Sequence, residues 1–110
     1  MASNPPRLNI TLTPRARRDL DGIWAWNAED RSPDHADAYD SFLLQQIDKL
    51  QTDYPRGRPL DVAPECQYVT FKKSQRGHGH YVIYQVHENT VEILRLFHTR
   101  QDWENRFMEG

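Results

Sequence analysis

Hydrophobic and polar residues alternate at the start of the chain. Leu8, Ile10 and Leu12 are each separated by one polar residue. Because successive side chains of a strand point to opposite faces, this spacing predicts a short strand over residues 7–12 with one buried face. Residues 1–6 are small, polar or proline, a composition that predicts a disordered tail.

Two stretches with helical spacing follow, and each begins with a hydroxyl residue and a proline. Thr13-Pro14 and Ser32-Pro33 are typical of helix starts, because the hydroxyl caps backbone N–H groups and proline fits the first turn. The first helix should end near residues 29–31, so that a very short connection folds the two helices into an antiparallel hairpin. Their buried stripes are expected at Ala16, Leu20, Ile23, Trp24 and Asn27, and at Ala36, Tyr39, Leu43, Ile47, Leu50 and Tyr54.

Three residues of the first helix are of special interest. Gly22 costs the helix about 1 kcal/mol relative to alanine, and we expect it to permit close packing at that point. Trp24 lies on the apolar stripe and is expected in the core. Trp26 falls off the stripe, which predicts either an exposed interface residue or partial packing against the second helix.

Strand patterns dominate the second half of the chain. Prolines and glycines predict a loop over residues 55–65. In the turn at residues 87–90, Asn89 tolerates a left-handed conformation. The order β-α-α-β-β-β-α predicts an α+β fold, in which a helical hairpin packs on a small, twisted, mainly antiparallel sheet and the first strand inserts in parallel. The three later strands and a short C-terminal helix are expected over residues 66–73, 80–86, 91–97 and 101–108.

Composition limits the class of protein. The chain has 110 residues, and 14 Lys+Arg against 16 Asp+Glu give a net charge of −2. This length predicts one small domain over residues 7–110. Apolar runs do not exceed four residues, as at 81–84, whereas a membrane span needs about 20. We expect a cytoplasmic protein, because no signal peptide pattern is present and Cys66 has no partner for an internal disulfide.

Positive charge and histidine gather in one part of the chain. Residues 66–100 hold five Lys/Arg against two Asp/Glu, and four of the five histidines. This mild basic surface suits an acidic protein partner or an RNA contact. It is too weak for a dedicated nucleic-acid-binding domain, whose pI would exceed about 9.

Five parts of the chain are of interest together: Thr13–Leu20 with Ile23-Trp24, Ser32-Pro33, Tyr54–Pro59, Tyr81–Val86 and Val91–Trp103. In this order and at this spacing, they resemble the ParE/RelE superfamily of type II toxin–antitoxin toxins, with the ParE branch closer. The resemblance implies a small toxin that inhibits DNA gyrase by protein binding, with no hydrolysis and no cofactor. It also implies a cognate antitoxin, ParD-like or another small protein, in a hetero-oligomer that alone contacts nucleic acid.

The resemblance leaves a RelE-type, ribosome-dependent mRNA endoribonuclease as an alternative. RelE-like enzymes carry alternating lysines on the first strand of the hairpin sheet, but the matching stretch Tyr68–Phe71 is uncharged. Lys72 and Lys73 follow side by side and so point to opposite faces. Arg100 matches the family arginine after the last strand. A third hypothesis is a non-toxic partner in an autorepressor complex.

Candidate site residues follow from these hypotheses. For the nuclease, Arg100 would act with His98, His78 and His80, since imidazole has a suitable pKa for proton transfer. A metal site at His78 and His80 lacks a convincing set of four ligands. Alternatively, Arg100 forms a strand-end ion pair with Asp102, and residues 72–80 are a solvated, mobile turn. The candidates for binding a target or antitoxin are Trp26, Lys72, Lys73, Arg76, Arg95, Arg100, Trp103 and Phe107.

Overall fold

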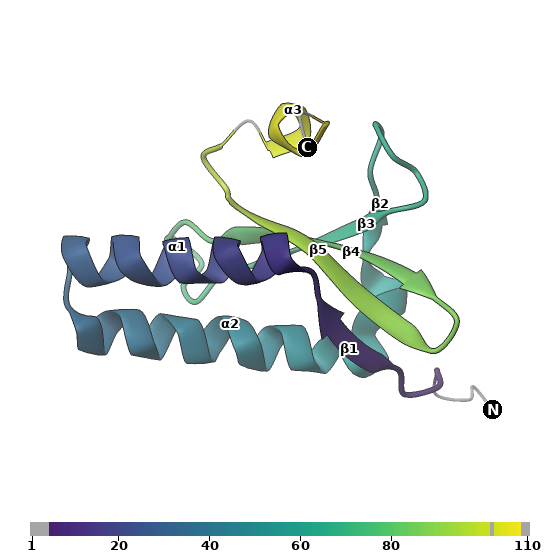
Figure 1. Ribbon diagram of the computed structural model, residues 1–110, viewed down its shortest axis with the longest axis horizontal. Helices are drawn as coiled ribbons and strands as arrows, with labels where there is room; N and C mark the ends of the chain where they lie inside the picture. Colours follow the sequence, from purple (N-terminus) through teal and green to yellow (C-terminus); the bar gives the residue numbers. More distant parts are fainter. Residues whose placement is uncertain (1–4, 102, 109–110) are drawn as a thin grey trace.

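The computed structural model describes residues 5–101 and 103–108 (Figure 1). The α+β fold and its order of elements are confirmed. Two short elements come in addition: η1 overlaps the start of the loop expected over residues 55–65, and β2 lies within it. The elements are β1 (Asn9–Leu12), α1 (Pro14–Asp30), α2 (Pro33–Asp53), the 3-10 helix η1 (Tyr54–Arg56), β2 (Arg58–Pro59), β3 (Gln67–Phe71), β4 (His80–His87), β5 (Thr90–His98) and α3 (Trp103–Met108).

The strands form one sheet in the order β1-β5-β4-β3-β2. β1 pairs in parallel with β5, with Ile10 opposite Val91, and the other pairs are antiparallel. The expected parallel insertion of the first strand is therefore confirmed. β2 was missed because two residues give no alternation to detect, and Pro59 is tolerated there because β2 is an edge strand.

The helices α1 and α2 lie side by side as the expected antiparallel hairpin, which extends past the sheet in Figure 1. Both predicted caps are present: Thr13 Oγ1 accepts a hydrogen bond from the N–H of Ala16 at 3.0 Å, and Ser32 Oγ accepts one from His35 at 3.0 Å. None of the described helices is long and apolar enough to cross a membrane.

Apolar side chains pack on both faces of the sheet, because alternate residues of β4 point to opposite sides. Val82 faces the helical hairpin and Ile83 faces away from it. The hairpin-side core contains Leu8, Ala16, Leu20, Leu43, Ile47, Leu50, Val82, Tyr84, Val91, Ile93 and Leu96. The smaller core on the other face contains Leu60, Ala63, Cys66, Ile83 and Phe97, with Tyr68, Leu94, Trp103 and Phe107 packed against it.

A buried tyrosine fixes the segment that joins α2 to the sheet. Tyr84 is fully buried, and its hydroxyl donates to the carbonyl of Tyr54 at 2.7 Å. A Cβ atom at Gly57 would collide with the Tyr84 hydroxyl and lie 2.7 Å from the ring carbon that carries it. Glycine is therefore required at this position by the close approach of the tyrosine.

Three local expectations are wrong. Trp24 is 37% exposed rather than in the core, because its indole N–H finds an acceptor at the surface, Asp37 Oδ1 at 2.8 Å. Apart from the adjoining residues and backbone of α1, no described atom lies within 4 Å of a Cβ built at Gly22, so that glycine allows no close packing against another described element. In the β4–β5 turn the left-handed residue is Glu88, with φ of 57°, and not Asn89.

Candidate functional site

A groove of about 610 Å³ lies between α1 and the strand ends where β4 begins and β5 finishes. The antiparallel register places His80 directly opposite His98, so both rings lie on the same face of the sheet. We call this space the histidine groove. Its lining residues are Arg18, Asp19, Gly22, Ile23, Trp26, His78, His80, Leu96, His98, Arg100 and Gln101.

The three histidines of the groove form a series from the surface to the interior. His78 is exposed, His98 is half-buried and His80 is 7% exposed. The ring centroids of His78 and His98 lie 5.5 Å apart, and those of His98 and His80 lie 5.2 Å apart. At the inner end, Nδ1 of His80 lies 2.7 Å from the hydroxyl of Tyr39 in α2.

Burial keeps the inner groups of this series uncharged at neutral pH. Burial, with a smaller effect of His98, lowers the pKa of His80 from 6.5 to about 4. Burial, with smaller effects of His78 and Arg100, also lowers the pKa of His98. Burial raises the pKa of Tyr39 to about 12, so its hydroxyl stays protonated at neutral pH and can donate a hydrogen bond to His80. The imidazoles of His80 and His98 are therefore neutral near pH 7 and able to accept protons.

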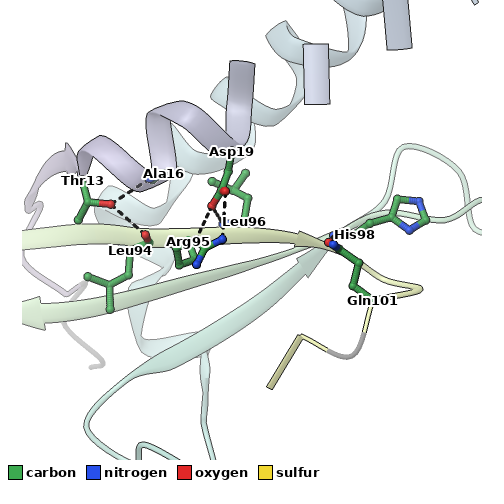
Figure 2. A network of polar contacts seen from close by, with 8 residues as sticks. All are labelled: Thr13, Ala16, Asp19, Leu94, Arg95, Leu96, His98 and Gln101. Carbon is green, nitrogen blue, oxygen red and sulfur yellow. Dashed lines mark hydrogen bonds and ion pairs between the residues drawn. The ribbon is translucent and has the colours of Figure 1, made fainter. Parts of the chain in front are cut away.

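His98 also organises the turn that follows β5. Its Nδ1 accepts a hydrogen bond from the backbone N–H of Arg100 at 3.1 Å. Its own backbone N–H donates to Oε1 of Gln101 at 2.8 Å (Figure 2). Because Nδ1 is an acceptor, the neutral ring carries its proton on Nε2. These bonds fix the backbone of Arg100 beside the histidines.

The edge of β5 next to the groove is closed by side chains of α1 and its cap (Figure 2). Thr13 Oγ1 donates to the carbonyl of Leu94 at 2.9 Å, and Asp19 Oδ2 accepts from the N–H of Leu96 at 2.9 Å. Arg95 donates to both carboxylate oxygens of Asp19, at 2.8 and 3.3 Å. Its guanidinium also lies 4.5 Å from the ring centroid of Phe97. Arg95 is thus engaged within the chain.

Of the remaining predicted residues, all but Trp26 lie away from the groove or outside the described residues. Lys72, Lys73 and Arg76 are exposed between β3 and β4. Trp103 and Phe107 pack against the smaller core on the other face of the sheet. Trp26 is 62% exposed and lines the groove. Asp102, the expected ion-pair partner of Arg100, lies outside the described residues.

The remaining groups with possible chemistry are metal-binding side chains and the free cysteine. Within residues 5–101 and 103–108, no group of three or more histidine, cysteine or acidic side chains is placed to hold a metal ion. Cys66 is buried, and burial together with Glu65 raises the pKa of its thiol. The thiol therefore stays protonated and inert at neutral pH.

Sequence reasoning found the histidines and Arg100 but missed their surroundings. Arg18, Tyr39 and Gln101 were not among the expected site residues. One signal was available for the first of them: Arg18, Gly22 and Trp26 recur every four residues, which places them on one face of a helix. Tyr39 and Gln101 gave no comparable signal, because their roles depend on tertiary contacts.

This arrangement of a helical hairpin, a small twisted sheet and a short last helix is shared with solved structures from type II toxin–antitoxin systems. The family model described as ParE toxin of type II toxin-antitoxin system, parDE, matches residues 10–103. The chain belongs to this family and hence to the ParE/RelE superfamily of toxins.

Relatives from both branches of the superfamily are similar to this chain. Toxin RelE3 of Caulobacter vibrioides is 31% identical over 91 residues, which cover 83% of this chain and 94% of that protein. The chromosomal ParDE TA system from P. aeruginosa has a TM-score of 0.73 at 21% identity, covering 84% of this chain and 96% of that chain. The toxin–antitoxin complex RelBE2 from Mycobacterium tuberculosis has a TM-score of 0.56 at 23% identity, covering 90% and 100%. The two solved structures show the shared fold alone.

Proposed function

We propose that this toxin inhibits DNA gyrase by binding to it, without hydrolysis, and that a cognate antitoxin neutralises it. The observation that carries the proposal is the absence of cationic side chains from β3. RelE-like nucleases place lysines on the first strand of the hairpin sheet, whereas β3 of this chain carries no cation. The family match to ParE toxins supports the same conclusion.

Aromatic packing occupies one face of β3 and of its neighbour β4. Tyr68 and Thr70 of β3 share one face with Tyr81, which pairs with Thr70. The rings of Tyr68 and Tyr81 lie 5.0 and 4.9 Å from the ring of Trp103 in α3. Tyrosine and threonine cannot neutralise a developing phosphate charge as lysine does. This surface is better suited to packing than to phosphate cleavage.

The antitoxin is the second element of the proposal. The P. aeruginosa ParDE system and the M. tuberculosis RelBE2 complex, which share the fold, are both toxin–antitoxin assemblies. We expect a small antitoxin, ParD-like or of another type, to form a hetero-oligomer with this chain. A flexible antitoxin segment that folds on binding would suit such an assembly.

A gyrase cleavage assay tests the proposal. The purified chain is added to DNA gyrase and supercoiled plasmid, and the enzyme is then denatured with detergent. Stoichiometric toxin should increase the amount of linear plasmid, and prior addition of the antitoxin should abolish the increase. Topoisomerase I serves as the control target. No linear plasmid at a large molar excess of toxin over gyrase would overturn the proposal.

Ribosome-dependent cleavage of mRNA is a second candidate, favoured by the convergence of His78, His80, His98 and Arg100 in one groove. A neutral imidazole can accept the 2′-hydroxyl proton and a guanidinium can stabilise the phosphate. In a translating-ribosome assay, R100A should then lower cleavage by about 100-fold, and R17A should not. Absence of cleavage by the wild-type chain would exclude this function. Unchanged growth on induction without antitoxin would favour the non-toxic autorepressor partner.

A further inference from the structure

A glycine in the middle of α1 faces open space in the histidine groove. Glycine lowers helix propensity relative to alanine, so a helix interior retains it most readily where a backbone must be approached closely. At Gly22 no other described part of the chain makes that approach, because nothing beyond the adjoining residues and backbone of α1 itself lies within 4 Å of an added Cβ. The space above Gly22 is therefore open to a molecule from outside the chain.

The same face of α1 presents a large flat ring beside this opening. Trp26 lies one helical turn after Gly22, lines the same groove and is 62% exposed. Ile23 and Leu96 supply apolar surface next to it. A planar aromatic group lying over Gly22 and against Trp26 would remove apolar surface from water on both of its sides.

The walls of the groove carry positive charge that no described residue neutralises. Arg18 comes from α1 and Arg100 from the turn after β5. Among the described residues, neither guanidinium has a hydrogen bond or ion pair. Asp19, the carboxylate of the lining set, is already bound by Arg95 and by the N–H of Leu96. Guanidinium groups match the geometry of phosphate oxygens.

We propose that the histidine groove binds a nucleotide, with the base over Gly22 against Trp26 and the phosphate between Arg18 and Arg100. The volume of about 610 Å³ lies within the range of small-ligand sites, roughly 300–1,000 Å³. The exposed ring of Trp26 beside two guanidinium groups fits one nucleotide, either free or at the end of a single strand. The inference goes beyond gyrase inhibition and uses neither gyrase nor ribosomes in its test.

Isothermal titration calorimetry of the purified chain measures how much the base and the phosphate each contribute to binding. AMP should bind at least about tenfold more tightly than adenosine or inorganic phosphate, because base and phosphate are each expected to contribute. A hexa-adenylate distinguishes the two sources: tighter binding than AMP, normalised per strand, indicates single-stranded nucleic acid. Binding equal to that of AMP indicates a free nucleotide.

Substitution of the glycine separates binding from folding. G22L fills the open space above α1 and should weaken AMP binding by at least about tenfold. Its thermal midpoint should stay the same or rise, because leucine is the better helix former. A25L, at an exposed position of the same helix outside the groove, is the matched control and should bind AMP normally. R18Q should weaken binding about tenfold, and its neighbour R17Q should not.

Three results would overturn the inference. They are no heat of binding with AMP at millimolar concentration, AMP affinity unchanged in G22L, and binding of an acidic helical peptide by a chain that does not bind AMP. The last result would assign the groove to a protein partner. Each of them leaves the gyrase assay untouched, so failure of the nucleotide site and failure of gyrase inhibition are distinguishable.

Discussion

A single buried imidazole makes the stability of this toxin depend on pH. The pKa of His80 is about 4 in the folded chain against 6.5 for a free side chain, mainly because of burial. Between these two values the unfolded chain binds more protons, so the free energy of unfolding falls as pH falls from 6.5 to 4. The full loss from this residue is about 3 kcal/mol.

Urea unfolding between pH 7 and pH 4 measures this effect. H80Q keeps a polar side chain near the Tyr39 hydroxyl but does not titrate, so its unfolding free energy should fall about 3 kcal/mol less over that range than that of the wild type. H35Q, at an exposed position of α2, is the matched control and should follow the wild-type curve. An equal fall for H80Q and the wild type would show that another group carries the pH dependence.

Gly57 and the Tyr84 hydroxyl lie so close together that each limits substitution of the other. G57A should destabilise the chain by about 1–3 kcal/mol, because the new methyl group would overlap the Tyr84 hydroxyl. Y84F should cost about 1 kcal/mol, because the bond to the Tyr54 carbonyl is lost.

The double variant of this pair should cost less than the sum of the two single changes, because phenylalanine leaves room where the hydroxyl was. Denaturant midpoints of the four proteins complete the cycle. Strict additivity would show that the two residues do not compete for the same space.

At the scale of elements, α1 provides a hydrogen-bond acceptor for the part of the β5 edge that does not pair with β1. Asp19 accepts from the N–H of Leu96 and from Arg95, whose side chain is 16% exposed. D19A should destabilise the chain by about 3 kcal/mol, because it removes an edge hydrogen bond and leaves a half-buried guanidinium unpaired. R17A, an exposed change in the same helix, should alter stability by less than about 0.5 kcal/mol. A similar small effect of D19A would contradict the closing role of this carboxylate.

The elements themselves were predictable from sequence because their signals are local. The Thr13 and Ser32 caps mark the helix starts, and alternation in the last three strands marks the sheet. Trp24 was misplaced because periodicity describes a helix face and not how much of that face a short sheet covers. Glu88 was missed as the left-handed residue because turn geometry is set by strand register as well as by residue preference.

At the scale of the whole molecule, the groove depends on contacts that no local pattern contains. His80 and His98 meet because β4 and β5 pair in one register, and α1 supplies the opposite wall from the other end of the chain. Sequence reasoning reached the histidines through composition and a family resemblance. It could not place Arg18 or Tyr39 beside them, because that placement requires the helical hairpin to be docked on the sheet.

Charge is also distributed unevenly over the whole molecule. On the helical hairpin, burial together with Asp21 and Asp37 raises the pKa of Asp40, which marks a concentration of acidic groups. The loop between β3 and β4 instead exposes Lys72, Lys73 and Arg76. An acidic antitoxin segment would be attracted to that loop and repelled by the hairpin, so the field of the toxin should orient the approaching partner.

Reversal of the loop charges tests this orientation. The triple variant K72E, K73E and R76E should lower the association rate constant with the antitoxin by about tenfold at low salt. The thermal midpoint should change little, because the three side chains are exposed. At about 1 M salt the Debye length is only about 3 Å, so the rates of variant and wild type should converge. Equal rates at low salt would show that the loop lies outside the path of the antitoxin, and a difference that persists at high salt would show direct contact instead of steering.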